Sequence, residues 1–315
     1  MPSCPGAVAP SLSFWSDMKE LNNKVAVITG AASGIGRGMA EVFAAAGMRV
    51  VLSDVEPSAL DATTQALRDA GADVHAVRCD VSKADQVDEL ARQTLRRYGA
   101  VHVLCNNAGV GVRAGPSWTN SLQDWHWILG VNLMGAVHGL RSFLPIMIEQ
   151  GTEAHIVNTA STSGLISDDN TLYGVSKFAL VALSEGVYWE LRHGRYKPKI
   201  SVLCPGCVDT NILASQRNRP AELAGSTPAA IDPVAVAVQE WYAEQLKQGL
   251  SPRAVGEQVL AAIRDERFYI MTHAEEYRPY IERRMKDVLS GNNPTFLPPR
   301  GIASLMQKLN ALAGR

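Results

Sequence analysis

Cysteine is scarce in this chain of 315 residues, and the scarcity excludes one class of protein. Five cysteines are too few and too scattered for a disulfide framework in a chain of this length, so we expect a reducing, cytoplasmic setting. Cys204 and Cys207 do form a C-x-x-C, but the motif follows a strand pattern instead of opening a helix. No second Cys/His pair stands at ligand spacing, so no metal is predicted.

An excess of charge is also absent. The chain has 30 basic and 31 acidic residues, a formal net charge of −1, which gives no electrostatic reason to expect nucleic acid or an anionic membrane as a partner. We identify no apolar run long enough to span a bilayer. Residues 1–17 lack the basic start and apolar core of a signal peptide. We expect a flexible leader over residues 1–20, of which residues 1–17 are dispensable.

Short β-branched runs alternate with helical stretches through most of the chain. This alternation predicts an α/β fold, a Rossmann-type doubly wound parallel sheet in a three-layer αβα single domain. Residues 211–252 interrupt the pattern directly after a strand end, where open α/β sheets bind ligands, so they are interpreted as a substrate lid. The catalytic domain is expected over 21–275, with a helical C-terminal extension over 276–315. The expected strands are 24–29, 49–54, 74–79, 101–105, 155–159, 199–204 and 268–271.

Three glycines follow the first expected strand. Gly30, Gly34 and Gly36 have the spacing G-x-x-x-G-x-G, which allows the backbone to turn sharply and approach a pyrophosphate at a helix N-terminus. An ordinary tight turn between a strand and a helix is the alternative. The position between the first strand and the first helix favours dinucleotide binding.

Acidic residues end the next two expected strands. Asp54 lies where a carboxylate can bond the adenosine ribose, and it would repel a 2′-phosphate. No Arg or Lys occurs at positions 31–33 to receive such a phosphate, so NAD is favoured over NADP. Asp54 could instead cap the helix that begins near Pro57. Asp80 could contact the adenine or cap a turn.

Tyr173 and Lys177 stand four residues apart in an expected helix and therefore share one face. A phenol is a poor base at neutral pH, but a fixed cation beside it favours its ionised form. This spacing is common by chance, so its meaning depends on the glycine turn upstream and on the other motifs.

Six motifs occur together in the order typical of one family: Thr29-Gly30-x-x-x-Gly34-Ile35-Gly36, Asn106-Asn107-Ala108-Gly109, Asn132 in Val131-Asn132-Leu133, Ser161, Tyr173-x-x-x-Lys177 and Pro205-Gly206-Cys207-Val208-Asp209-Thr210. Over about residues 20–210 the chain resembles a short-chain dehydrogenase/reductase of the compact single-domain type. The resemblance implies that Tyr173 is the general base and that Lys177 lowers its pKa and holds the nicotinamide ribose. It also implies that Ser161 bonds the substrate oxygen and that Asn132 holds a water of a proton relay.

The same resemblance implies a set of cofactor contacts, and Thr210 would fix the nicotinamide end. The expected cofactor-binding residues are Gly30, Ser33, Gly34, Ile35, Gly36, Asp54, Asp80, Val81, Asn107, Ala108, Gly109, Tyr173, Lys177, Pro205, Gly206, Val208 and Thr210. The segment between Ser161 and Tyr173 departs from the common pattern because it is a residue short and unusually polar. Ser163 is a rival to Ser161 there, and Asp168 and Asp169 are either solvated loop residues or pocket residues that select a polar substrate.

These observations predict an NAD-dependent oxidoreductase that interconverts a secondary alcohol and a ketone. Leu213, Trp241 and Tyr242 in the expected lid suggest a fairly large aromatic, terpenoid or steroid-like substrate. A ketone reductase that uses NADPH, and a dinucleotide-binding regulatory protein without activity, are the alternatives. The resemblance suggests a homodimer or homotetramer, with the helices near Asn132 and Tyr173 at the interface.

Overall fold

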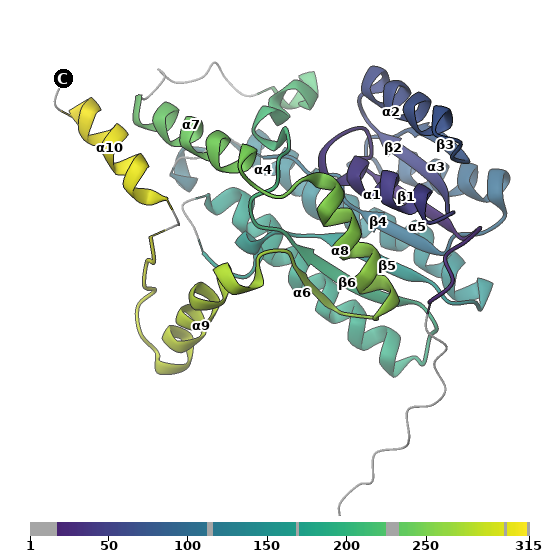
Figure 1. Ribbon diagram of the computed structural model, residues 1–315. Helices are drawn as coiled ribbons and strands as arrows, with labels where there is room; N and C mark the ends of the chain where they lie inside the picture. The colour runs from purple at the N-terminus through teal and green to yellow at the C-terminus, as the bar shows by residue number, and fades with distance from the viewer. Residues whose placement is uncertain (1–17, 112–115, 168–169, 225–232, 299–300, 314–315) are drawn as a thin grey trace, which may run out of the picture.

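Seven parallel strands form the centre of the computed structural model, which describes residues 18–111, 116–167, 170–224, 233–298 and 301–313 (Figure 1). The strand order is β3-β2-β1-β4-β5-β6-β7, so the direction of winding reverses between β1 and β4. In open α/β sheets this reversal opens a crevice at the carboxyl ends of the strands. The strands are β1 (Val25–Thr29), β2 (Arg49–Asp54), β3 (Val74–Arg78), β4 (Val103–Asn106), β5 (His155–Thr159), β6 (Lys199–Cys204) and β7 (Tyr269–Met271).

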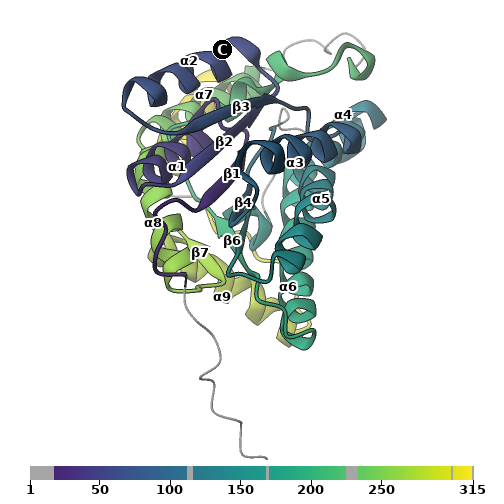
Figure 2. The same ribbon diagram turned by 90° about the vertical axis from the view of Figure 1, so that its right-hand side faces the viewer.

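Helices cover both faces of the sheet, which confirms the predicted doubly wound fold. Figure 2 shows α1 (Gly34–Ala45) and α8 (Pro252–Arg264) on one face, and α3 (Ala84–Tyr98), α5 (Gly135–Gln150) and α6 (Thr171–His193) on the other. The inner strands β1, β5 and β6 are buried almost throughout because both of their faces meet helices. Buried Met18 and Leu21 pack into this core before β1 begins.

Some boundaries differ from the sequence-based expectation. Helix α2 (Pro57–Asp69) was expected, whereas α8 was not. It packs closely against α1, and a Cβ on Gly256 would lie 2.7 Å from the backbone oxygen of Gly38. Helix α3 begins after Lys83, and the Ser82 hydroxyl before it donates to the Asp80 carboxylate at 2.7 Å.

The long helical region before β5 is not one regular helix. Helix α4 (Leu122–Leu129) passes through a π-helical turn (Gly130–Met134) into α5, and π turns are frequent at functional sites. By length and hydropathy alone Leu122–Gln150 could cross a bilayer, which the sequence-based expectation overlooked. However, 44% of its most apolar window is buried inside the protein, and core helices of soluble proteins pass the same test.

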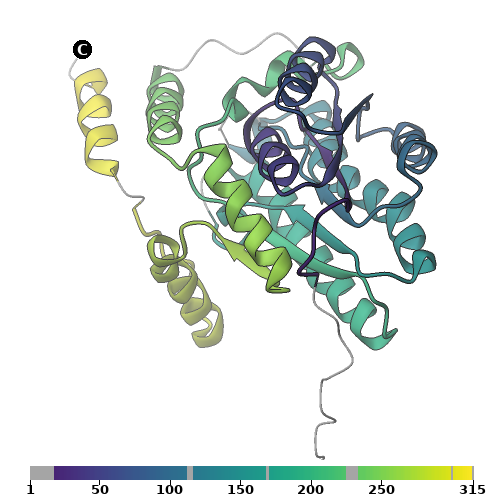
Figure 3. The ribbon, with the colours of Figure 1, turned by 45° about the vertical axis from the view of Figure 1, so that its right-hand side comes forward.

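The C-terminal third of the chain lies over the carboxyl ends of the strands. The expected lid contains short 3₁₀ turns (Ile212–Asn218 and Ala221–Leu223) and α7 (Pro233–Lys247), followed by α8, β7 and α9 (Ala274–Ser290). Figures 1 and 3 show α10 (Ile302–Ala313) beside α7 and apart from the sheet. The indole of buried Trp241 donates to the Ser304 hydroxyl over 3.1 Å, and Lys308 pairs with Glu244 at 2.8 Å. The extension therefore packs on the back of the lid helix.

Candidate active site

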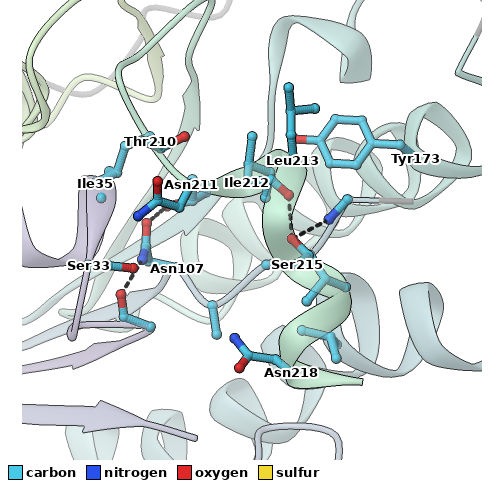
Figure 4. Close-up of a pocket in the computed structure, with 18 of the residues that line it drawn as sticks. Ser33, Ile35, Asn107, Tyr173, Thr210, Asn211, Ile212, Leu213, Ser215 and Asn218 are labelled. Atoms are coloured by element: carbon cyan, nitrogen blue, oxygen red, sulfur yellow. Dashed lines mark hydrogen bonds between the residues drawn. The ribbon is translucent and has the colours of Figure 1, made fainter. Parts of the chain in front are cut away.

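One large cavity of about 1160 Å³ opens at the carboxyl ends of the strands. It extends from Asp54 at the end of β2 to Tyr173 on α6 and Tyr242 on α7. In Figure 4 the lid residues Ile212 and Leu213 lie on the same side as Tyr173, and Ser33 and Ile35 lie across the cavity from it. The cavity is therefore long enough to hold an extended ligand that connects the glycine turn to the Tyr173 side.

The glycine turn between β1 and α1 lets a ligand come close to the backbone. Gly30 has a φ of +64°, and a Cβ there would lie 2.9 Å from the Cα of Ala108. A Cβ on Gly36 would lie only 2.0 Å from the Gly30 oxygen, so any side chain at that position would force the turn apart. The cradle is thus open at Gly30, Ser33, Gly34 and Ile35, while Gly36 lies behind it and does not line the cavity. A pyrophosphate at the start of α1 fits these constraints.

The β2 end of the cavity carries a fixed carboxylate. Asp54 accepts the Ala32 N–H at 3.0 Å and the Glu56 N–H at 3.1 Å, which holds its side chain against the glycine turn. Glu56 occupies the N-cap position of α2 without a side-chain capping bond, so Asp54 is not the N-cap. Asp80 lines the same region and accepts the Ser82 N–H at 2.9 Å, which gives it a turn-capping role within the cavity wall.

Tyr173 and Lys177 share one face of α6, as their spacing predicts. The Lys177 ammonium lies 5.5 Å from the centre of the Tyr173 ring and donates to the Thr159 carbonyl at 2.9 Å. Burial lowers the pKa of Lys177 to about 8, because a desolvated ammonium is less stable than a hydrated one. The residue is only 3% exposed, so its charge acts on Tyr173 with little screening by solvent.

Ser161 stands at the start of the short turn Thr162–Gly164 after β5. Its hydroxyl oxygen accepts the Ser163 N–H at 3.1 Å, so the hydroxyl hydrogen is not used in this bond and can be donated to another group. Ser163 lines the same cavity, so both candidate serines reach it. The expected pocket residues Asp168 and Asp169 lie outside the described residues.

Asn132 is buried in the π turn and does not line the cavity. Its amide oxygen accepts the Val110 N–H at 2.8 Å, and its amide nitrogen donates to the Val110 carbonyl and to the Ser176 hydroxyl, each at 3.0 Å. The side chain therefore joins the loop after β4 to α6 and braces the helix that carries Tyr173.

Charged contacts attach the lid to the rest of the molecule. Arg217 bonds the Glu56 carboxylate at 2.9 Å, and Asn218 donates to the same oxygen at 2.7 Å. Arg219 pairs with Asp124 of α4 at 2.5 Å and lies over the Trp127 ring at 5.2 Å. The lid is thus held at the β2 end of the cavity and beside α4.

The cavity brings together nearly all of the residues that the motifs predict. Gly36 and Asn132 are the two that do not line it, and both support it from behind. Trp118 is 85% exposed and does not border the cavity, and Trp241 lies under α10 while its neighbour Tyr242 lines the wall. The cavity-lining residues from the predicted sets are Gly30, Ser33, Gly34, Ile35, Asp54, Asp80, Val81, Asn107, Ala108, Gly109, Ser161, Tyr173, Lys177, Pro205, Gly206, Val208 and Thr210.

Several cavity residues were missed by the sequence reasoning. Glu56, Arg78 and Arg217 line the β2 end, and Trp127 and Tyr277 line other parts of the wall. Glu56 lies two positions after Asp54, a spacing that could have drawn attention to it. Tyr277 offered no such signal, because it lies in the expected helical C-terminal extension, outside every motif.

Comparison with known proteins places the chain among oxidoreductases. The model of the short chain dehydrogenase family matches residues 24–221. A CLA biosynthesis dehydrogenase/reductase of Lactiplantibacillus plantarum is 36% identical over 88% of this chain and 97% of its own length. A 1-deoxy-11-beta-hydroxypentalenate dehydrogenase of Streptomyces avermitilis is 35% identical over 81% of this chain and 86% of its own.

The same fold occurs in solved structures. A short chain dehydrogenase/reductase from Burkholderia phymatum, crystallised in complex with NAD, superposes with a TM-score of 0.85 at 42% identity. The match covers 89% of this chain and 99% of that protein, so it includes much of the lid and the C-terminal region beyond the family model.

Proposed function

The chain belongs to the short-chain dehydrogenase family, and we propose that it interconverts a secondary alcohol and a ketone with NAD as the hydride carrier. One observation carries the proposal. Tyr173, with the buried Lys177 beside it, faces the cavity that also contains the glycine turn and Ser161. A base, a cation and a hydroxyl donor therefore border the same space as the dinucleotide cradle, which is the arrangement that alcohol oxidation requires.

Each proposed site residue has a separate role in the transfer of the hydroxyl proton. When bound, NAD supplies the acceptor for the hydride of the carbinol carbon. Tyr173 takes the hydroxyl proton, and the Lys177 cation favours the tyrosinate that does so. Ser161 donates to the substrate oxygen and stabilises the charge that develops on it. Asn132 acts from behind by fixing α6 and the loop after β4.

The choice of NAD over NADP rests on Asp54. Its carboxylate lies in the cavity at the end of β2, where it can accept from both ribose hydroxyls and would repel a 2′-phosphate. The structure of the Burkholderia phymatum relative contains NAD, which supports the same choice. Arg78, Lys83 and Arg217 also line that end, which favours the NADPH-dependent ketone reductase as the second candidate.

The size of the cavity supports a fairly large substrate. Its volume of about 1160 Å³ is above the range of about 300–1000 Å³ that is typical of ligand pockets. Val238, Tyr242 and Leu246 of α7 form an apolar wall. We propose a bulky aromatic, terpenoid or steroid-like alcohol, and the hydroxypentalenate dehydrogenase relative fits a polycyclic skeleton of this kind.

Replacing Tyr173 by Phe tests the function directly. We expect Tyr173→Phe to lower kcat by at least about 10²- to 10⁴-fold, because the general base is removed while the ring remains. The measurement is nicotinamide absorbance with a panel of secondary alcohols and ketones, together with NADH binding by fluorescence, which should be unchanged.

Tyr188→Phe is the matched control, because Tyr188 lies on the same helix and its hydroxyl accepts from Arg192 outside the cavity. It should retain full activity. Unchanged turnover in Tyr173→Phe would refute the assignment. NADH binding without turnover of any alcohol or ketone by the unmodified chain would instead support the inactive regulatory protein.

The remaining assignments concern the assembly and its parts. We propose a cytoplasmic homodimer or homotetramer that associates through the exposed faces of α4, α5 and α6, where Met134, Val175 and Trp189 are exposed. The proposed parts are a leader over 1–20, a catalytic domain over 21–275 and a helical extension over 276–315. Analytical ultracentrifugation tests the assembly, and a monomer at micromolar concentration would contradict it. A chain truncated to begin at Met18 tests the leader, and failure of that chain to fold would show that residues 1–17 are not dispensable.

A further inference from the structure

Tyr277 reaches the cavity from a part of the chain that the family model does not cover. The match to the family model ends at residue 221, whereas Tyr277 lies in the first turn of α9, directly after β7. Its ring lines the cavity together with Ser161 and Tyr173. The C-terminal extension therefore contributes a polar group to the space that the motifs define.

Close packing fixes the position of the Tyr277 ring. A Cβ on Gly206 would lie 2.8 Å from Cε2 of Tyr277 and 2.8 Å from Nδ1 of His273. The Gly206 N–H donates to the Thr272 hydroxyl at 3.1 Å, which joins the same segment to the end of β7. Only glycine fits between the loop after β6 and the start of α9, so the ring is held at a defined place.

The Tyr277 hydroxyl is held beside the residue that follows Ser161. A side-chain hydrogen bond joins the Tyr277 hydroxyl to Thr162. The Thr162 N–H in turn donates to the Pro205 carbonyl at 3.0 Å, so this partner is fixed as well. A phenol can accept one hydrogen bond while it donates another, so the contact with Thr162 leaves Tyr277 able to donate to a ligand in the cavity.

The surroundings of Tyr277 keep it protonated. Burial raises its pKa well above the ordinary value for tyrosine, and the neighbouring Cys207, Glu276 and Tyr242 act in the same direction. Tyr173 is placed beside a buried ammonium, which favours its ionised form. Tyr173 and Tyr277 are therefore suited to opposite tasks: Tyr173 accepts a proton, and Tyr277 donates a hydrogen bond without losing its proton.

We infer that Tyr277 is a specificity-determining residue, which donates a hydrogen bond to a second oxygen of the substrate, close to the reacting carbinol. The inference rests on the proposed function. Ser161, Thr162 and Tyr277 all line the cavity, and Tyr277 bonds the residue that follows Ser161, so the second oxygen lies on the same side of the cavity as the reacting carbinol. The facing wall of α7 is apolar at Val238 and Leu246. The substrate class is thus a secondary alcohol on an apolar ring skeleton with a nearby ether, hydroxyl or carbonyl oxygen.

Pairs of alcohols that differ by one oxygen test this inference. The probes are 4-chromanol against 1-tetralol, and tetrahydropyran-4-ol against cyclohexanol, assayed with NAD by nicotinamide absorbance. We expect the unmodified chain to prefer the oxygen-bearing member of at least one pair, with a kcat/KM about tenfold higher. The hydrocarbon member displaces water from the Tyr277 phenol without offering it a hydrogen-bond acceptor, which weakens binding. Tyr277→Phe should abolish that preference through a higher KM, with the hydrocarbon member changed by less than about twofold.

Tyr280→Phe is the matched control, because Tyr280 lies on the same helix and donates to the Pro298 carbonyl outside the cavity. It should leave the preference unchanged, and NADH affinity should be the same in all variants. An unchanged preference in Tyr277→Phe, an equal loss for both members of a pair, or no preference in the unmodified chain would overturn the inference while the proposed function stands. Absence of turnover with every alcohol and ketone would overturn both.

Discussion

Asp54 is the single residue that we propose selects the cofactor. Both of its carboxylate oxygens accept backbone N–H groups, from Ala32 and Glu56, so the side chain cannot rotate out of the cavity without leaving two donors unpaired. Its remaining lone pairs are the ones that can accept from ribose hydroxyls.

Replacing Asp54 is expected to shift the cofactor preference. Asp54→Ala removes the ribose acceptor and the repulsion of a 2′-phosphate, while Arg78 remains nearby. We expect the ratio of NAD to NADP affinity to fall by at least about tenfold, which fluorescence titration with NADH and NADPH measures. Asp61→Ala, on an exposed position of α2, serves as the control. A constant ratio in Asp54→Ala would show that another residue selects the cofactor.

The residues proposed for catalysis could be identified from the sequence because they lie in short motifs. Tyr173 and Lys177 meet through helical spacing alone. Tyr277 could not be identified in this way, since its contact with Thr162 joins the last third of the chain to the loop after β5. Asn132 was predicted by motif, but its bonds to Val110 show a bracing role that no motif specifies.

At the scale of elements, the lid depends on contacts with distant parts of the chain. Glu56 accepts from both Arg217 and Asn218, and it lies beside the end of the cavity that contains Asp54. Opening of the lid must break these charge-assisted hydrogen bonds.

Removal of this contact is expected to speed up cofactor release. Glu56→Ala leaves Arg217 and Asn218 without their shared acceptor, at a cost of about 1 kcal/mol for a partly exposed group, or about fivefold in the dissociation rate of NADH. Stopped-flow displacement of bound NADH measures this rate. Glu41→Ala breaks an exposed pair with Arg37 on α1 and should have no effect. A rate in Glu56→Ala equal to that of the unmodified chain would show that the contact does not restrain the lid.

Elements with strong local patterns were predicted, and those that depend on packing were not. Strands β5 and β6 have the expected bounds because β-branched runs end at clear breaks. Helix α8 was missed because it lies beyond the expected lid, in a stretch for which no element was predicted. Its close contact with α1 through Gly38 and Gly256 is visible only in three dimensions.

For the whole molecule, the buried His155 and the half-buried His102 make stability depend on pH. His102 accepts the Val25 N–H at 3.0 Å, and His155 bonds the Ser201 hydroxyl at 2.7 Å. Burial lowers the pKa of His102 to about 4 and that of His155 to about 3. Both are neutral in the folded chain at a pH where the unfolded chain begins to bind protons.

The free energy of unfolding is therefore expected to fall with acidification. Between pH 6.5 and 4 the unfolded chain binds more protons than the folded one, so each histidine lowers stability by up to about 1.4 kcal/mol per pH unit, whereas the contribution is constant above pH 7. Urea denaturation at a series of pH values measures the slope. His155→Asn should reduce it, and His126→Gln, at an exposed position, should not. An equal slope in His155→Asn would contradict the assignment.

The sequence by itself determined the succession of strands and helices, the glycine turn and the Tyr173–Lys177 pair, because each depends on residues close together in the chain. Only the tertiary structure decided which distant segments meet. Glu56 and Arg217 are 161 positions apart, and Tyr277 joins the cavity from beyond the family motifs. Such contacts arise from the packing of whole elements against the sheet, so the spacing of residues along the chain does not predict them.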